Sequence, residues 1–331
     1  FCGGPRSKYA LARQEPYFVH QRHRSSTAKR SPALKIIVLG RSGQLGQCLL
    51  EQFSSSEPQS NDATFTTQLF GKSECDLTNF HQIREVFLTH SPDVIINAAA
   101  YTAVDAAEDN AVLADNLNHK AVSLLAELCY EFDSVLIHIS TDYVFDGRGT
   151  TPYLESAPTA PQGVYGTTKL LGEQAIAATK CKQIIIRSAW IFSEHGSNFL
   201  KTMLRLGDER DHIRVVDDQY GTPTYAQDLA RAIIEILPYI ANKTCPWGTY
   251  HYAGNSTVSW FEFAQQIFSS AKALSLKTPE KLSAIATTEY PTPAPRPAYS
   301  ALSTELFTGT FAMKPSDWRA GIDRTLAKVT K

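Results

Sequence analysis

Short apolar segments alternate with amphipathic ones up to about residue 190. Apolar, β-branched runs predict buried strands at 35–40, 64–70, 93–100, 134–140 and 183–188. Apolar residues at helical spacing between them predict helices at 44–53, 80–90, 111–132 and 165–180, the second capped by Thr78 or Asn79. Strict alternation of apolar strands and helices predicts an α/β fold with a doubly wound parallel sheet.

The pattern loosens in the last part of the chain. It predicts helices at 228–238 and 260–273, a strand at 249–253 and a proline-rich loop at 291–297. We therefore expect a dinucleotide-binding core over 34–190, to which parts of 214–253 return. The rest, mainly 191–331, should form a smaller C-terminal substrate-binding lobe whose loops set substrate choice.

A glycine-rich turn directly follows the first predicted strand, with the spacing Gly40-x-x-Gly43-Gln44-Leu45-Gly46. In a dinucleotide-binding (Rossmann) unit the first glycine permits a tight turn. The second lets the backbone approach a pyrophosphate, and the third lets the helix pack closely on the strand. The next helix then offers free N–H groups to the phosphates. A strand-to-helix turn without ligand is the alternative interpretation.

Three segments fall at the carboxyl ends of predicted strands. They are Gly40, the run Ala98, Ala99 and Ala100, and Ser140 with Thr141. Because ligands of parallel sheets bind at this edge, the three segments are expected to line one crevice.

Tyr165 and Lys169 are spaced i, i+4 on a predicted helix, which places both side chains on one face. A phenol loses its proton near pH ~10, and a neighbouring ammonium favours the phenolate. With Thr141 the pair suits reduction of a carbonyl, because both hydroxyls can hydrogen-bond the oxygen while a hydride reaches the carbon. Chance alone often supplies such a pair, so the glycine-rich turn upstream is what strengthens the hypothesis.

Charge and hydropathy narrow the classes of function. The formal net charge of −1 argues against nucleic acid as the main partner. No apolar run approaches the ~18 residues of a membrane span.

Residues 1–34 differ in charge from the rest of the chain, because they hold seven Lys or Arg and one Glu. Their composition resembles an organelle transit peptide, and a disordered extension or translated upstream sequence are the alternatives. We expect residues 1–33 to be disordered and leave targeting open.

The six cysteines form no C-x-x-C pair and have no His at metal-ligand spacing, so no metal site is expected from them. Cysteines on apolar elements, such as Cys129 and Cys181, are most often buried thiols. They indicate a reducing compartment, here the cytoplasm.

Seven motifs in order resemble the extended short-chain dehydrogenase/reductases, and among these the family of dTDP-4-dehydrorhamnose reductases. The resemblance covers residues 35 to about 325. Besides the glycine-rich turn and Tyr165-Gly-x-x-Lys169, the motifs are Asp93-Val-Ile-Ile-Asn97-Ala98-Ala99-Ala100-Tyr101-Thr102-Ala-Val104-Asp105, Ser140-Thr141-Asp142-Tyr143-Val-Phe-Asp-Gly147, Arg187-Ser-Ala-Trp190, Asp218-Gln219-Tyr-Gly221-Thr222-Pro223-Thr224 and Arg296-Pro297.

The resemblance implies NADPH- or NADH-dependent reduction of the C4 carbonyl of dTDP-4-dehydro-6-deoxy-L-mannose to dTDP-L-rhamnose. It implies that Tyr165 donates the proton, that Lys169 also binds the nicotinamide ribose and that Thr141 orients the carbonyl. It implies a cofactor site comprising Gly40, Gly43, Gln44, Leu45 and Gly46 at the pyrophosphate, Asp76 and Leu77 near the adenine, and Ala98, Ala99 and Ala100 beside the nicotinamide. Asp142, Trp190 and Arg296 would face the nucleotide sugar, and Asn118 would hold the active-site backbone.

Simpler interpretations compete for several of these residues. Trp190 suits plain core packing, and 221–224 suits a turn that opens the next helix. Arg296 among prolines suits a solvated surface charge as well as a diphosphate clamp. Asp105 and Glu108 suit the complementing of a helix N-terminus.

Two positions depart from the family pattern. Tyr299 replaces an Asn of the substrate loop, which puts that loop in doubt. Some members form a dimer bridged by magnesium through a Glu two residues after the last glycine. That position is Cys48 here, so the metal is not carried over and a homodimer stays open.

Other functions compete with reduction at C4. Nucleotide-sugar dehydratases place Asp-Glu after the Thr, whereas Asp142-Tyr143 follows here, which disfavours dehydration. Another reductase or an epimerase would keep the Tyr/Lys pair. A non-catalytic alternative is a regulatory subunit like that of methionine adenosyltransferase, which the intact Thr141, Tyr165 and Lys169 disfavour.

The end of the second predicted strand bears on the cofactor. It has no acid until Glu74, whereas NAD-specific sheets usually place an acid there for the ribose 2′-OH. Lys72 and Ser73 could attract a 2′-phosphate. We expect NADPH to be accepted at least as well as NADH. The alternative is an indifferent enzyme with Lys72 as a solvated turn residue.

Overall fold

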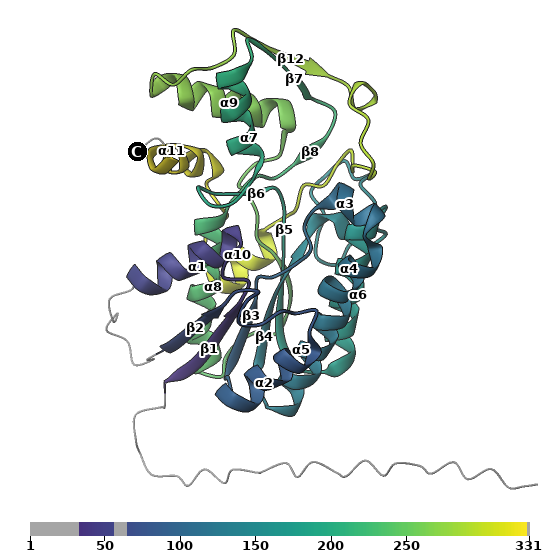
Figure 1. Ribbon diagram of the computed structural model, residues 1–331, viewed down its shortest axis with the longest axis vertical. Helices are drawn as coiled ribbons and strands as arrows, with labels where there is room; N and C mark the ends of the chain where they lie inside the picture. The colour runs from purple at the N-terminus through teal and green to yellow at the C-terminus, as the bar shows by residue number, and fades with distance from the viewer. Residues whose placement is uncertain (1–32, 56–64, 330–331) are drawn as a thin grey trace, which may run out of the picture. The chain divides into compact units, whose positions relative to one another are not determined.

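The computed structural model describes residues 33–55 and 65–329, so all but the last residue of the predicted disordered extension, 1–33, lies outside the described residues. Its centre is a parallel sheet in the order β10-β5-β4-β3-β1-β2 (Figure 1). The strands are β1 (Leu34–Leu39), β2 (Phe65–Phe70), β3 (Val94–Asn97), β4 (Val135–Thr141), β5 (Lys182–Ser188) and β10 (Gly248–His251). The predicted α/β fold with a doubly wound parallel sheet is confirmed.

Alternate strand residues face two separate hydrophobic cores. On β1, Ile36 and Val38 join one core, and Ile37 and Leu39 join the other. The first core is covered by α1 (Gln44–Ser55), α8 (Ala226–Ala241) and α10 (Glu305–Phe311). The second is covered by α2 (Phe80–His90), α5 (Ala121–Glu131) and α6 (Val164–Thr179). Because both faces are covered, the inner strands β1 and β3 are mostly apolar rather than alternating.

The helix predictions are most accurate where a capping residue and the apolar periodicity indicate the same boundary. Helix α2 has the predicted bounds, and Asn79 rather than Thr78 is its N-cap. The predicted helix at 111–132 is present as α4 (Ala111–Asp115), a π-helical turn η1 (Asn116–Lys120) and α5. Sequence periodicity missed the π turn, which inserts one residue into the helical repeat.

Two predicted elements differ from the observed ones in length by four residues or more. The third strand ends at Asn97: the N–H of Ala98 donates to the carbonyl of Leu39 on β1, and the next residues are no longer paired in the sheet. Helix α8 continues three residues past Pro238, since Ile240 still packs in the first core.

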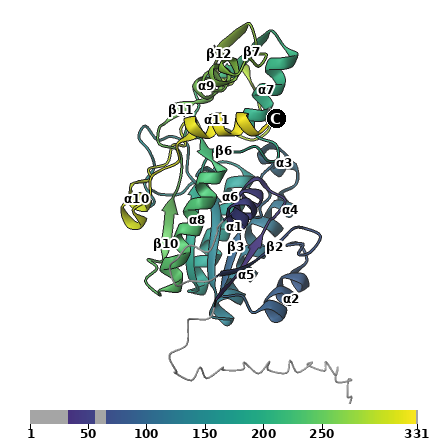
Figure 2. The ribbon, with the colours of Figure 1, turned by 90° about the vertical axis from the view of Figure 1, so that its left-hand side faces the viewer.

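A further part of the described chain packs around Phe263 and Trp318 at the carboxyl edge of the sheet (Figure 2). Its helices are α7 (Phe199–Glu209), α9 (Trp260–Ala273) and α11 (Trp318–Val329), and α9 has the predicted bounds. Its two-residue strands pair β6 (Ile191–Phe192) with β9 (Thr224–Tyr225) and β8 (Tyr220–Gly221) with β11 (Val258–Ser259), and β7 (His212–Val216) pairs with β12 (Lys281–Ile285). Helix α7 was not predicted, although its N-cap Asn198 accepts a hydrogen bond from the N–H of Lys201.

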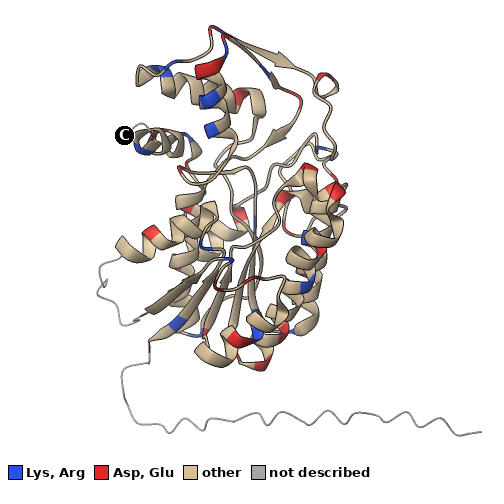
Figure 3. Cartoon of the chain, in the orientation of Figure 1, with Lys and Arg blue, Asp and Glu red and all other residues tan. Residues whose placement is uncertain are grey.

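Charged residues of both signs are interspersed over the helices, and the central strands contain few (Figure 3). The six strands hold Lys35, Lys182 and Arg187 as their charged residues. Arg187 is buried and forms a 2.6 Å ion pair with Glu173 of α6. Among the described residues, no helix combines the length and the apolar composition needed to cross a membrane.

Candidate active site

Thr141, Tyr165 and Lys169 meet where β4 ends and α6 begins. Thr141 is the last residue of β4, and its hydroxyl donates to the carboxylate of Asp142 at 3.0 Å and lies next to the Tyr165 phenol. Burial raises the pKa of Tyr165 above its ordinary value, and the Thr141 contact partly opposes this rise. The phenol is therefore protonated at neutral pH, the state that a proton donor requires.

Lys169 is buried to 1 % exposure on the same face of α6. Its Nζ donates to the carbonyl oxygen of Ile139 at 2.6 Å and lies 3.2 Å from Nε2 of His138. Burial lowers the pKa of Lys169 to about 8, and Glu173 one turn further along α6 opposes that shift. Its proton is thus more easily lost than that of a solvated lysine.

Two contacts from distant segments position α6. Oε1 of Glu108, from α3 (Val104–Asp109), accepts a hydrogen bond from the backbone N–H of Val164 at 2.9 Å. Asn118, in the π turn, bonds both backbone groups of Tyr101 and the hydroxyl of Thr168. The backbone contacts of Asn118 agree with its implied role, and Glu108 complements a helix N-terminus as one interpretation predicted.

The glycine-rich turn lies against the loop that follows β3. Gly40 has a φ of +98°, and an added Cβ would lie 2.7 Å from the backbone nitrogen of Ala99. A Cβ on Gly46 would collide with the carbonyl of Gly40, so the third glycine permits the close start of α1. Gly43 meets no such obstacle, since an added Cβ would lie 3.4 Å from the carbonyl oxygen of Gly40, which accepts from the N–H of Gly43 at 3.0 Å. The predicted convergence of Gly40 with the run Ala98, Ala99 and Ala100 is therefore present at Ala98 and Ala99.

The glutamine and leucine of this turn have different surroundings. Leu45 is buried in the first core. Oε1 of Gln44 accepts hydrogen bonds from Ser193 and from Asn198 at 2.8 Å, which ties the turn to the segment after β5.

Arg41 is a residue that the sequence analysis missed. Its guanidinium forms a 2.6 Å ion pair with Glu74, and it also reaches the carbonyl of Leu69 at the end of β2. Glu74 accepts in addition from the N–H of Gly71 and the hydroxyl of Ser73. A basic residue directly after the first glycine was the available clue. Both charges lie where the ribose 2′ substituent of a dinucleotide binds in this fold.

Other predicted residues lie further along the same connection. Lys72 has an 81 % exposed side chain whose Nζ is 3.8 Å from Asp76. Asp76 accepts from the backbone and the hydroxyl of Thr78, and Leu77 is buried in the second core.

Two of the candidate substrate residues, Asp142 and Arg296, lie on the side of Thr141 and Tyr165 where Tyr143 is found. Asp142 is buried beside it, and burial raises the pKa of Asp142 to about 6 against hydrogen bonds from Ser300 and Thr141. Arg296 is 20 % exposed and bridges Asp105 at 2.6 Å and the Tyr143 hydroxyl at 3.5 Å. Tyr143 in turn meets the ring of Tyr165 edge-on at 5.5 Å.

Trp190 is stacked on Trp260 with 3.5 Å between ring centroids, and its φ is +47°. This backbone conformation is uncommon and costly for a large residue. The side chain remains half-buried rather than enclosed. Trp190 therefore packs against its neighbours, as the simpler interpretation predicted, and its ring is still partly accessible.

A comparison with protein families shows to which family this chain belongs. The family described as RmlD substrate binding domain matches residues 34–331. The chain belongs to this family. A dTDP-4-dehydrorhamnose reductase of Shigella flexneri is 40 % identical over 295 residues, which are 88 % of this chain and 97 % of the relative. The resemblance seen in the motifs is confirmed.

Solved structures of the RmlD family agree. A dTDP-4-dehydrorhamnose reductase from Clostridium acetobutylicum has a TM-score of 0.81 and 33 % identity, covering 90 % of this chain and 100 % of that one. One from Bacillus anthracis, in complex with NADP, has a TM-score of 0.80 and 35 % identity, covering 89 % and 99 %.

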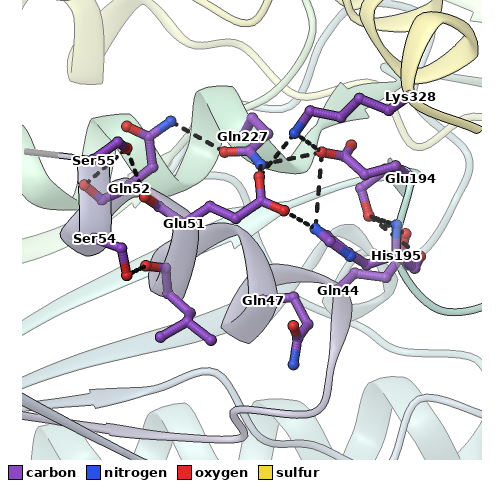
Figure 4. A network of polar contacts seen from close by, with 12 residues as sticks. Gln44, Gln47, Glu51, Gln52, Ser54, Ser55, Glu194, His195, Gln227 and Lys328 are labelled. Carbon is purple, nitrogen blue, oxygen red and sulfur yellow. Dashed lines mark hydrogen bonds and ion pairs between the residues drawn. The ribbon is translucent and has the colours of Figure 1, made fainter. Parts of the chain in front are cut away.

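The family-implied magnesium does not fit the residues of this RmlD family member. Cys48 is fully buried, and burial together with the nearby Glu194 raises the pKa of its thiol, so it stays protonated. Ligand atoms of Glu51, Glu194 and His195 do lie within 4.8 Å of one another. Lys328 of α11, however, forms ion pairs with both carboxylates (Figure 4).

This cluster is already satisfied from within the chain. Gln227 of α8 donates to Glu51 at 2.5 Å, and Glu51 also lies 2.7 Å from Nε2 of His195. Burial alone would raise the pKa of Glu51 and Glu194, but Lys328 holds both below their ordinary value. The carboxylates that a divalent cation would need are thus already paired with an ammonium.

Proposed function

We propose that this RmlD family member reduces the C4 carbonyl of dTDP-4-dehydro-6-deoxy-L-mannose (dTDP-4-dehydrorhamnose) to dTDP-L-rhamnose, using NADPH or NADH. The observation on which this rests is the meeting of Thr141, Tyr165 and Lys169 beside the glycine-rich turn at one edge of the sheet. The 40 % identity to a reductase of that name supports the same substrate.

The proposal gives each catalytic side chain one step, which the geometry supports. When bound, the reduced nicotinamide supplies the hydride that joins the carbonyl carbon. The Thr141 hydroxyl orients the carbonyl oxygen, and the protonated Tyr165 gives its proton to that oxygen as negative charge develops. Lys169 on the same helix face stabilises the phenolate that Tyr165 becomes. One hydride and one proton thus convert the ketone to an alcohol.

The cofactor would lie along the carboxyl edge from β2 to β4. The N-terminus of α1 at Gln44 and Leu45, directly after Gly43, suits the pyrophosphate. The loop of Ala98, Ala99 and Ala100 would face the nicotinamide. Asp76 and Leu77 would lie near the adenine, and Lys169 would also bind the ribose.

Asp142, Trp190 and Arg296 are the proposed contacts to the nucleotide sugar. Arg296 presents a guanidinium suited to a diphosphate, while its pair with Asp105 holds the proline-rich loop against α3. Trp190 offers a half-exposed aromatic face for the sugar or base. Five described cysteines, all buried and unpaired, support a reducing compartment such as the cytoplasm.

An absorbance assay of the purified protein tests this proposal. NADH or NADPH is mixed with a panel of 4-keto nucleotide sugars, and the loss of the reduced nicotinamide is followed. Consumption with dTDP-4-dehydrorhamnose is expected. Interconversion of sugars without net consumption would favour an epimerase, and binding without turnover would favour a regulatory subunit.

A further inference from the structure

His138 lies directly behind Lys169 and is absent from the mechanism above. It is a fully buried residue in the middle of β4, a strand that is otherwise mostly apolar. The ring nitrogen Nε2 is 3.2 Å from Nζ of Lys169. On its other side, Nδ1 is 3.2 Å from the side-chain nitrogen of Asn97, the last residue of β3. The imidazole therefore connects two strands to the catalytic lysine.

The orientation of Asn97 determines which ring nitrogen holds the proton. The amide oxygen of Asn97 accepts from the backbone N–H of Ala99 at 3.2 Å, so the amide NH₂ must face the ring. Nδ1 of His138 then accepts that hydrogen bond. Burial and the nearby Lys169 lower the pKa of His138 well below its ordinary value, so the ring is neutral. A neutral ring whose Nδ1 accepts has its proton on Nε2.

The Nε2–H group of His138 thus points at Lys169. An uncharged amine can accept that hydrogen bond and still donate to the carbonyl of Ile139, 2.6 Å away. An ammonium has no lone pair, so it would face the N–H group without forming a bond. The ring consequently favours the neutral form of Lys169 and holds its nitrogen beside the Ile139 carbonyl.

The other charged groups around Lys169 do not produce this effect. Glu173 on α6 favours the ammonium, but its carboxylate is bound by Arg187 of β5 at 2.6 Å and by the hydroxyl of Ser140 at 2.5 Å. Tyr165, one turn earlier on α6, is protonated and uncharged. The titratable groups next to Lys169 are therefore a neutralised acid, a neutral phenol and the imidazole.

We propose that His138, oriented by Asn97, is a positioning residue that sets the proton affinity of Lys169 through its Nε2–H group. The inference rests on the proposed function, because it gives this lysine a readily exchanged proton during carbonyl reduction. Burial already lowers the pKa of Lys169 to about 8, which is near neutral pH.

The test compares His138→Phe with His138→Gln across a pH series. Phe removes the N–H group, whereas the Gln amide can still donate from a similar place. We expect the pH at which kcat/KM falls on the alkaline side to move up by about one unit in His138→Phe, because Lys169 becomes more basic. His138→Gln should keep the wild-type profile. Equal pH profiles in all three proteins would overturn the proposal. An equal loss of kcat/KM in both variants without a shift of the alkaline limb would also overturn it.

A measurement on the unmodified protein covers the case in which His138→Phe does not fold. Nitrogen NMR of ¹⁵N-histidine-labelled protein, with His138 assigned through His138→Gln, reports the tautomer without any substrate. The expected result is a neutral ring protonated at Nε2 from pH 6 to 9, and an Nδ1-protonated or titrating ring would overturn the proposal. Failure of the wild type to reduce any nucleotide sugar would instead count against the proposed function alone.

Discussion

The Glu108 carboxylate accepts a hydrogen bond from the backbone N–H of Val164 at 2.9 Å, across 56 residues of sequence. Val164 is the first residue of α6, whose N-cap Gly163 has no side chain to satisfy a free N–H group. Glu108 therefore replaces a local cap and attaches α3 to the helix that contains Tyr165 and Lys169.

Replacing Glu108 with Ala should lower the free energy of unfolding by about 1 kcal/mol, the usual cost of losing a cap. It should also lower kcat/KM, because the first turn of α6 contains Tyr165. Urea unfolding followed by circular dichroism measures the first effect. Asp109→Ala, a neighbouring exposed acid, is the matched control. Equal stability of the two variants would contradict the capping role.

Replacing Tyr165 with Phe should remove most turnover, by ~10²–10⁴-fold, and leave cofactor binding nearly unchanged. The phenol supplies a proton only as charge develops on the substrate oxygen, so the loss falls on kcat. Steady-state kinetics and fluorescence titration with NADPH measure the two effects. Tyr130→Phe, at a 65 % exposed position, is the control. Turnover by Tyr165→Phe close to that of the wild type would reject its role as proton donor.

Replacing Lys169 with Ala should harm both rate and cofactor affinity, because Lys169 is proposed to act on the phenol and on the ribose. The same titration separates these effects. Lys169→Met keeps the length of the side chain without its charge and serves as a packing control. If Lys169→Ala bound the cofactor as tightly as the wild type, the proposed contact of Lys169 with the ribose would be wrong.

Cofactor preference should depend on Arg41 more than on Lys72. Arg41 is held at the end of β2 by Glu74, whereas the Lys72 side chain is 81 % exposed. Arg41→Ala should lower kcat/KM for NADPH by about tenfold relative to NADH, because the guanidinium suits a 2′-phosphate. Glu74→Gln should shift the ratio toward NADPH by removing a repelling charge. Lys72→Ala is the comparison, and a wild type with a strong preference for NADH would contradict the expectation that NADPH is accepted at least equally.

The cluster of Lys328 with Glu51, Glu194 and His195 should stabilise the protein at neutral pH more than at acid pH, and it should need no magnesium. Lys328 holds the pKa of Glu51 and Glu194 below their ordinary value. A lowered acid pKa contributes stability above its unfolded value, and this is lost as pH falls through the folded pKa. Lys328→Met should therefore cost roughly 1 kcal/mol at pH 7 and less at pH 4. Thermal melts at both pH values measure this, with Lys328→Arg as the control. A rise in the wild-type Tm on adding magnesium chloride would contradict the assignment.

Local patterns in the sequence were sufficient for the sheet and for the main candidate residues. The apolar runs of β1, β4 and β5 show their burial directly, because strands covered on both faces have no polar side. The i, i+4 spacing of Tyr165 and Lys169 needs only a helix, and Gly40 to Gly46 needs only a strand and a turn. Each of these features lies within one element and its nearest neighbours.

By itself, then, the sequence determined the alternating elements, the glycine-rich turn and the Thr141, Tyr165 and Lys169 set. Only the tertiary structure decided that Glu108 caps α6, that Arg41 pairs with Glu74 and that His138 faces Lys169. These partners are 31 to 56 residues apart. Which of many similar polar side chains meet depends on sheet order and helix packing, and no periodicity within a single element records either.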